Sequence, residues 1–280
     1  YQVGLRCEPV SDACPYHVLG YSFSGMPGII IGQTDRVAWG FTNLGPDVAD
    51  LVIERLDGDR VQTEDGWEPL EVLTETVSVA GGDDVELTIR IGPNGPLFSD
   101  VSEAGAEIAE GPLATADGGD EAAEGDGEVE HAVALRWVAL DPVTTADAVP
   151  LIMQARDWDS FRTAARRFEV PSQSLVYADV DGHIGYQAPG RIPVRRSGDV
   201  EELPWTFDPP TGVLATANQP VLAPGSEPFL SRDFNIGYRA VRIDELLEAE
   251  AQLSLDDLLA IQLDAHNGNA ANLVPVLLDV

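Results

Sequence analysis

The chain has 280 residues, 48 of them acidic and 16 basic, which gives a formal net charge of −32. This charge argues against nucleic acids and anionic membranes as partners, because both are bound through clustered cations. An apolar content of 44% with long β-branched runs argues against a disordered chain, so we interpret the charge as a surface adapted to high salt.

The first predicted strands lie next to the only two cysteines, Cys7 and Cys14. A disulfide across a short turn and a pair of thiols are equally open alternatives at this spacing. The C-x6-C spacing without a neighbouring histidine is not a zinc-binding pattern. No apolar run in the sequence approaches the length of a transmembrane helix.

Residues 25–56 form the most informative block of the sequence. Residues 28–32 are a β-branched run typical of a strand buried on both faces, and residues 37–42 predict a second strand. Asn43 follows at once, and then a loop that carries Asp47 and Asp50. A polar residue at a strand end beside two carboxylates is a common way to build a binding or catalytic site.

The segment 57–130 is predicted to contain β-hairpins and then an acidic loop. Period-two alternation at 76–79 and 85–90 flanks the turn residues 81–84. Seven of the fourteen residues from Asp117 to Glu130 are acidic and none is basic, which predicts a mobile solvated loop, with a functional acidic lid as the alternative.

The rest of the chain alternates predicted strands and helices. Residues 132–140 predict a strand, residues 145–168 a helical stretch, and residues 174–180 and 183–187 a hairpin turning at Asp181-Gly182. Leu214 to Ala217 predict a strand that ends at Asn218. Helices follow, one of them capped by Ser254. We expect one α+β domain over residues 1–280, with 57–130 as an excursion and 240–280 helical.

Four blocks of the sequence carry a recognisable pattern. They are PGIIIGQTDRVAWGFTN with DVADLVIERL in residues 27–56, PSQSLVYADVDGHIGYQAPGRIP at 171–193, GVLATANQ at 212–219 and GYRAVRIDELL at 237–247. In this order they resemble the β-subunit of the penicillin acylase family, which are N-terminal-nucleophile (Ntn) amidohydrolases. The resemblance implies a four-layer αββα sandwich, present here in part, with an inserted acidic loop and C-terminal helices.

The amino terminus departs from the family pattern. The family's nucleophile is the first residue of the mature β-chain, usually serine, whereas this chain begins Tyr1-Gln2. We expect a fragment that lacks the nucleophile and is inactive alone, and the alternative is a protein that has lost its chemistry. An N-terminal nucleophile uses its own α-amino group, with an ordinary pKa of about 8, as general base, so the four histidines need not be catalytic.

The resemblance implies catalytic roles for three residues. The side-chain amide of Asn218 and the backbone N–H of Asn43 would donate to the oxyanion, and Arg239 would orient the groups around them. The alternatives are ordinary: turn-forming asparagines, and an arginine paired on the surface with Asp244 or Glu245.

Asp47 and Asp50, with the backbone carbonyl of Ala49, resemble the family's calcium loop. One short loop cannot fill the coordination shell of Ca²⁺, so further ligands would come from elsewhere, including the separate α-subunit. The alternative is a pair of solvated loop carboxylates.

The resemblance also places Met26, Ile31, Phe41 and Gln173 near the acyl or leaving group of the substrate. Phe41 would reshape the acyl pocket, which argues against phenylacetyl specificity and leaves aliphatic chains open, including those of acyl-homoserine lactones.

The sequence therefore predicts a hydrolase of linear acyl amides, of the penicillin or N-acyl-homoserine-lactone type, that works through an acyl-enzyme. Its partner would be an α-subunit released from the same precursor by self-cleavage. We expect an extracellular or cell-envelope location in a halophile, with the cytoplasm as the alternative. The competing hypothesis is a non-catalytic or calcium-binding structural module.

Overall fold

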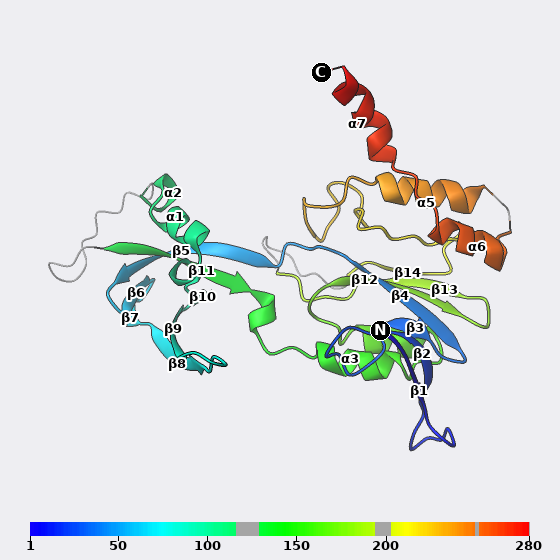
Figure 1. Ribbon diagram of the computed structural model, residues 1–280, viewed down its shortest axis with the longest axis horizontal. Coiled ribbons are helices and arrows are strands. Elements are labelled where there is room, and N and C mark those ends of the chain that lie inside the picture. Colours follow the sequence, from blue (N-terminus) through cyan, green and yellow to red (C-terminus); the bar gives the residue numbers. More distant parts are fainter. Residues whose placement is uncertain (116–128, 194–202, 250–251, 280) are drawn as a thin grey trace. The chain divides into compact units, whose positions relative to one another are not determined.

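The computed structural model describes residues 1–115, 129–193, 203–249 and 252–279. The chain folds into two compact units (Figure 1). The first unit combines Tyr1–Asp47 with Pro142–Val280, and the second is the intervening segment Val48–Asp141.

The first unit is built on a seven-stranded sheet in which all neighbouring strands are antiparallel. In spatial order its strands are β1 (Gln2–Arg6), β2 (His17–Tyr21), β3 (Ile31–Gln33), β4 (Val37–Asn43), β12 (Gln173–Asp179), β13 (Ile184–Gln187) and β14 (Trp205–Phe207). The pairing of β4 with β12 joins two segments that lie 130 residues apart in the chain at Asn43 and Gln173.

One face of this sheet is covered by helices α3 (Thr145–Ile152) and α4 (Trp158–Ala165). Every second residue of the central strands points into this core, so Trp39 and Leu175 are buried there with Phe161 of α4. The expectation of one helical stretch over 145–168 is wrong. The first helix ends at Ile152, and Asp157 starts a second one by a capping box with Ser160.

Within the described residues of the first unit, the opposite face of the sheet is covered over part of its width. On this face, Tyr186 of β13 packs in a second hydrophobic cluster with Leu44 and Leu230. Leu19, Tyr21 and Ile31 lie on the same face according to the strand register, but they are 46%, 60% and 40% exposed. The predicted strand at 28–32, buried on both faces, is therefore wrong: the strand begins only at Ile31, and the buried residues Ile29 and Ile30 precede it.

The C-terminal part of the first unit contains a long irregular segment and three helices. Leu214 to Ala217 were predicted as a strand and form none. The helices are α5 (Tyr238–Glu248), α6 (Leu255–Gln262) and α7 (Gly268–Leu278). The predicted cap at Ser254 is confirmed, since its side chain accepts a hydrogen bond from the Asp257 N–H.

The second unit contains two small antiparallel sheets and short helices. One sheet has the order β11 (Glu130–Trp137), β5 (Ala49–Asp57), β6 (Arg60–Thr63), β7 (Gly66–Pro69), and the other has the order β10 (Gly95–Pro96), β9 (Val85–Gly92), β8 (Glu71–Val77). The helices are η1 (Phe98–Asp100), α1 (Glu103–Ala109), α2 (Pro112–Thr115) and η2 (Val138–Leu140). The predicted hairpin around 81–84 is present as β8–β9. Residues 116–128 of the predicted acidic loop lie outside the described residues.

Cys7 and Cys14 form a disulfide that closes the turn between β1 and β2. This settles the choice between a disulfide and two thiols. Among the helices that the structure describes, none combines the length and the apolar character that crossing a bilayer requires.

Candidate active site

Asn43 is the last residue of β4, and the ladder with β12 ends just after it. The Leu44 N–H donates to the Ser172 carbonyl at 3.3 Å, and Gly45, with φ of +68°, then turns the chain away. Hydrogen-bonded and non-bonded pairs alternate along an antiparallel ladder. The Asn43/Gln173 pair is consequently non-bonded, and both the N–H and the C=O of Asn43 face away from β12.

Asn218 reaches this free edge of β4 from the irregular segment. Its side-chain Nδ2 donates to the Asn43 carbonyl at 2.8 Å. A second link runs beside the first, because the Thr42 hydroxyl lies 2.9 Å from the Thr216 hydroxyl. Two residues that are 175 positions apart in the chain therefore meet at one strand end.

The backbone of Asn218 has φ of +64°, in the left-handed region that asparagine tolerates better than most residues. The conformation is held from both sides of the residue. The Asn235 N–H donates to the Asn218 carbonyl at 3.0 Å. The Gln219 side chain accepts from the Ala217 N–H at 2.6 Å and donates to the Ala215 carbonyl at 3.0 Å. Strain of this kind persists where surrounding bonds enforce it, often at functional sites.

Arg239, in the first turn of α5, fixes the orientation of the Asn218 amide. Its Nη2 donates to Asn218 Oδ1 at 2.7 Å and to the Ala217 carbonyl at 3.0 Å. A guanidinium only donates and a carbonyl only accepts, so the oxygen of the Asn218 side chain must face Arg239 and its nitrogen must face Asn43. One N–H of that nitrogen is used on Asn43, and among the described residues the second N–H has no acceptor.

Gln173 lies opposite Asn43 on the helix-covered face of the sheet and is 7% exposed. Its Nε2 donates to Asn43 Oδ1 at 3.1 Å and to the Pro171 carbonyl at 3.3 Å. The structure thus brings together four of the predicted site residues: Asn43, Gln173, Asn218 and Arg239.

The other three predicted pocket residues are distributed differently. Phe41 lies on the same face of β4 as Asn43, and its ring meets that of Phe168 edge-on at 5.4 Å. Ile31 lies on the opposite face of the sheet from Phe41, as the β3–β4 register shows. Met26 belongs to the turn before β3 and is 38% exposed.

Along the sequence, the division between the two units falls inside the predicted calcium loop, between Asp47 and Val48. The Asp47 N–H donates to the Leu230 carbonyl at 2.6 Å, and Ala49 and Asp50 begin β5. Within the described ranges no three His, Cys, Asp or Glu residues are grouped so that they could hold a metal. Ca²⁺ takes six to eight oxygens, so these two carboxylates and a carbonyl fit only part of its shell.

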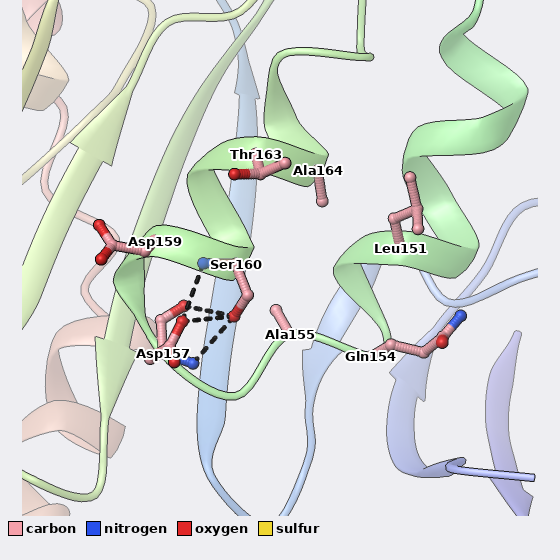
Figure 2. Close-up of a pocket in the computed structure, with 8 residues that line it drawn as sticks. All are labelled: Leu151, Gln154, Ala155, Asp157, Asp159, Ser160, Thr163 and Ala164. Atoms are coloured by element: carbon pink, nitrogen blue, oxygen red, sulfur yellow. Dashed lines mark hydrogen bonds between the residues drawn. The ribbon is translucent and has the colours of Figure 1, made fainter. Parts of the chain in front are cut away.

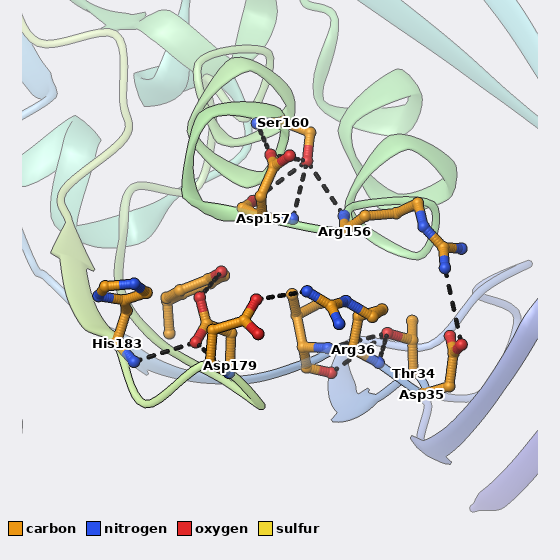
Figure 3. Close-up of polar contacts among 11 residues, drawn as sticks. Thr34, Asp35, Arg36, Arg156, Asp157, Ser160, Asp179 and His183 are labelled. Atoms are coloured by element: carbon orange, nitrogen blue, oxygen red, sulfur yellow. Dashed lines mark hydrogen bonds and ion pairs between the residues drawn. The ribbon is translucent and has the colours of Figure 1, made fainter.

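A polar cluster that sequence reasoning missed lies at the turn ends of β12 and β13, and Figure 3 labels two of its members, Asp179 and His183. Tyr177 donates to Asp179 at 2.7 Å, and burial together with this bond raises the pKa of Tyr177. His183 is one of the four histidines that the sequence does not require for catalysis. Its Nδ1 lies 2.7 Å from Asp208, and this hydrogen bond raises the pKa of His183 and lowers that of Asp208. All these groups satisfy one another, which is typical of a structural network.

A shallow pocket of about 510 Å³ lies at α3 and α4 (Figure 2). Its polar lining includes Asp157 and Ser160, whose side chains are both engaged in capping α4. None of the predicted site residues lines it, so it carries no argument about the reaction.

Comparison with known proteins identifies the family. A sequence profile described as penicillin amidase matches residues 1–280. The acyl-homoserine lactone acylase QuiP of Pseudomonas fluorescens is 30% identical over 281 residues, covering 92% of this chain and 32% of the relative. The penicillin acylase 2 proenzyme of a Pseudomonas species is 27% identical over 271 residues, covering 89% of this chain and 32% of the relative.

The fold is matched by a solved structure of thermostable penicillin G acylase from Alcaligenes faecalis. The TM-score is 0.70 at 22% identity, over 93% of this chain and 46% of that chain. This likeness supports the predicted mixture of helices and sheets, while the chain spans about a third of the length of the curated relatives. Because the profile match spans residues 1–280, the chain belongs to the penicillin amidase family.

Proposed function

We propose that this chain supplies the oxyanion-binding part of an amidohydrolase that cleaves linear acyl amides. The observation that carries the proposal is the meeting of the Asn218 amide with the free edge of β4 at Asn43, at 2.8 Å. In this proposal the second N–H of Asn218 and the backbone N–H of Asn43 bind the same oxyanion, and the contact of the Asn218 amide with the Asn43 carbonyl supports their closeness. Amide hydrolysis needs such a pair, because its tetrahedral intermediate carries a negative oxygen.

The nucleophile in this proposal is an N-terminal serine that is not in this chain. Its hydroxyl oxygen bonds to the amide carbonyl carbon while its proton passes to the serine's own α-amino group. The carbonyl oxygen becomes the oxyanion held by Asn43 and Asn218. When the intermediate collapses, the C–N bond breaks and the amine leaves with that proton. Water then releases the acid from the acyl-enzyme by the same steps.

Arg239 acts as a positioning residue. Its Nη2 is directed at Asn218 Oδ1 and the Ala217 carbonyl, so we propose that it acts on the oxyanion through the Asn218 amide. Its charge draws electron density toward Asn218 Oδ1, which makes the N–H groups of the same amide better donors.

We also propose that the partner is an α-subunit from the same precursor, and that it helps to complete the four-layer αββα sandwich. The uncovered apolar side chains Leu19, Tyr21 and Ile31 support a second sheet on that face. One relative is itself named a proenzyme.

For the substrate we propose an aliphatic acyl amide of the N-acyl-homoserine-lactone or penicillin type. The names of the relatives support these two classes. Phe41 supports an aliphatic chain, because its ring already occupies space against Phe168 beside the site.

Calcium and location are further proposals. Asp47, Asp50 and the carbonyl of Ala49 would supply part of a structural Ca²⁺ shell, and ligands beyond this chain would complete it. Chelation of calcium should lower the melting temperature of the intact protein, less so in Asp50→Asn, and an unchanged melting temperature would contradict the calcium site.

The Cys7–Cys14 disulfide supports an oxidising compartment outside the cytoplasm.

The test of the main proposal uses the full-length protein and the variant Asn218→Gly. Glycine accepts the φ of +64° without strain, so the variant removes the carboxamide and keeps the backbone. We expect kcat to fall about 10²–10³-fold, as on loss of an oxyanion donor. Asn267→Gly, at the exposed N-cap of α7, is the matched control. Activity of Asn218→Gly equal to that of the control would remove Asn218 from the mechanism.

A further inference from the structure

Asn43 carries a second polar group that the proposed reaction does not use, its own side-chain amide. The side chain is exposed at the end of β4, on the same face as Phe41. Its oxygen accepts a hydrogen bond from Gln173 Nε2 at 3.1 Å. In the part of the chain that the structure describes, no acceptor lies within hydrogen-bonding distance of its nitrogen.

The orientation of this amide follows from chemistry. Gln173 Nε2 also faces the Pro171 carbonyl at 3.3 Å, and a carbonyl can only accept, so the nitrogen end of Gln173 is turned toward Asn43. Asn43 must therefore accept this hydrogen bond with its side-chain oxygen, and its two side-chain N–H donors are directed away from Gln173. Burial of Gln173 at 7% exposure keeps this arrangement in place.

These donors lie close to the reacting carbonyl. The side-chain nitrogen of an asparagine is at most about 5 Å from its backbone nitrogen, by covalent geometry. In the proposed function, on which this inference rests, that backbone nitrogen holds the oxyanion at about 3 Å. The side-chain donors can therefore reach substrate atoms three or four bonds from the scissile carbon.

We propose that the Asn43 side chain is a specificity-determining donor that favours amides with an acceptor oxygen near the scissile bond. The oxygen belongs either to the acyl chain, as in a 3-oxo group, or to the leaving group, as in a lactone. Both sources offer the same chemistry, a neutral acceptor for a neutral N–H. A hydrogen bond of this kind changes kcat/KM about three- to tenfold.

The test measures kcat/KM for four substrates with the full-length protein. Hexanoyl and 3-oxohexanoyl groups are each joined to homoserine lactone and to cyclopentylamine, a ring of the same size without oxygens. We expect one of the two oxygenated positions to be preferred, and its preference ratio to fall about three- to tenfold in Asn43→Ala. In Asn43→Asp the ratio falls further, because a carboxylate repels the acceptor oxygen.

Controls distinguish failure of the inference about Asn43 from failure of the proposed function. Asn267→Asp adds the same charge at a helix cap and should keep the wild-type ratio. Gln173→Met removes the donor that orients Asn43 and should lower the ratio without touching Asn43. If the wild type cleaves these amides and both Asn43 variants keep its ratio, the inference is overturned. If the wild type cleaves none of the four substrates, the proposed function is contradicted, and so is the inference that depends on it.

Discussion

At the scale of single residues, variants of Arg239 can distinguish a role in positioning the Asn218 amide from a purely electrostatic role. Its Nη2 serves two acceptors, Asn218 Oδ1 at 2.7 Å and the Ala217 carbonyl at 3.0 Å. Lysine supplies the charge but not the planar fork, so Arg239→Lys should recover only part of the activity that Arg239→Met loses. We expect kcat to fall at least tenfold in Arg239→Met with KM little changed, because in the proposed mechanism the Asn218 amide acts mainly in the transition state.

Arg242 provides the matched control for this prediction. It lies one turn further along α5 and pairs with Asp264 at 2.7 Å. Arg242→Met removes a charge from the same helix and should leave kcat near its wild-type value. Equal losses in the Arg239 and Arg242 variants would mean that only the overall charge of α5 matters.

The residue scale also shows what the sequence could reveal about the site. Asn43 was singled out because it follows a predicted strand and matches a family block, and Asn218 and Arg239 because they match family blocks. The structure brings these three residues into contact. The left-handed backbone of Asn218 and its support by Gln219 and Asn235 were not predicted. They depend on contacts between the irregular segment and β4, and no local pattern encodes contacts that are 175 residues apart.

At the scale of elements, the start of α4 depends on the capping box of Asp157. Hydrogen bonds from the side chain and the backbone N–H of Ser160 lower the pKa of Asp157 below its ordinary 3.8. Asp157→Ala should therefore reduce the free energy of unfolding at pH 7 by about 1 kcal/mol, the usual effect of losing an N-cap. Asp157→Asn should lose less, because it still caps.

The pH dependence of this cap has a definite sign. A carboxyl whose pKa is lower in the folded state contributes stability above its unfolded pKa and loses it as pH falls through the folded one. The difference in unfolding free energy between wild type and Asp157→Asn should thus be full above pH 3.8 and shrink below it. Urea titrations from pH 7 to pH 3 measure it, and a difference that grows toward acid would contradict the capping account.

The packing of α4 on β13 gives a second prediction at this scale. A Cβ at Gly185 would lie 2.4 Å from the Trp158 ring. That ring is held by Phe207 and Tyr177, at centroid distances of 5.3 and 5.4 Å, and cannot easily retreat. Gly185→Ala should reduce the free energy of unfolding by about 1–3 kcal/mol, as overpacking does.

Gly40→Ala is the control, since its Cβ would meet only a Val176 methyl at 3.1 Å. Denaturant unfolding of both variants, with near-ultraviolet circular dichroism to follow Trp158, makes the comparison. A loss for Gly185→Ala no larger than that for Gly40→Ala would contradict the packing of Trp158 on β13.

Element boundaries mark the limit of local sequence patterns. Apolar periodicity identified residues 145–168 as helical. The break before Asp157 depends on whether the capping box is more stable than a continuous helix, and apolar periodicity does not report that balance. The run at 28–32 looked like a buried strand because Ile29 and Ile30 are buried, yet they are buried in the core before the strand begins. Hydrophobicity reports burial, while strand pairing is decided by the neighbouring chain.

At the scale of the whole molecule, the net charge of −32 decides how stability responds to salt. Repulsion among carboxylates acts over the Debye length, which is about 30 Å at 0.01 M salt and about 8 Å at 0.15 M. We expect the urea midpoint of the intact protein to rise steeply over this range, because screening relieves repulsion in the compact state more than in the expanded one.

The high-salt interpretation adds a stricter expectation. Simple screening is nearly complete once the Debye length reaches about 3 Å at 1 M salt, so it predicts a plateau there. A surface adapted to high salt should continue to gain stability between 1 and 3 M NaCl. Repeating the series in acid, where most of the 48 carboxyl groups are protonated, tests the cause. If the rise above 1 M is unchanged when those carboxylates are neutral, it belongs to a general salting-out of apolar surface, and the acidic surface is not what adapts this protein to salt.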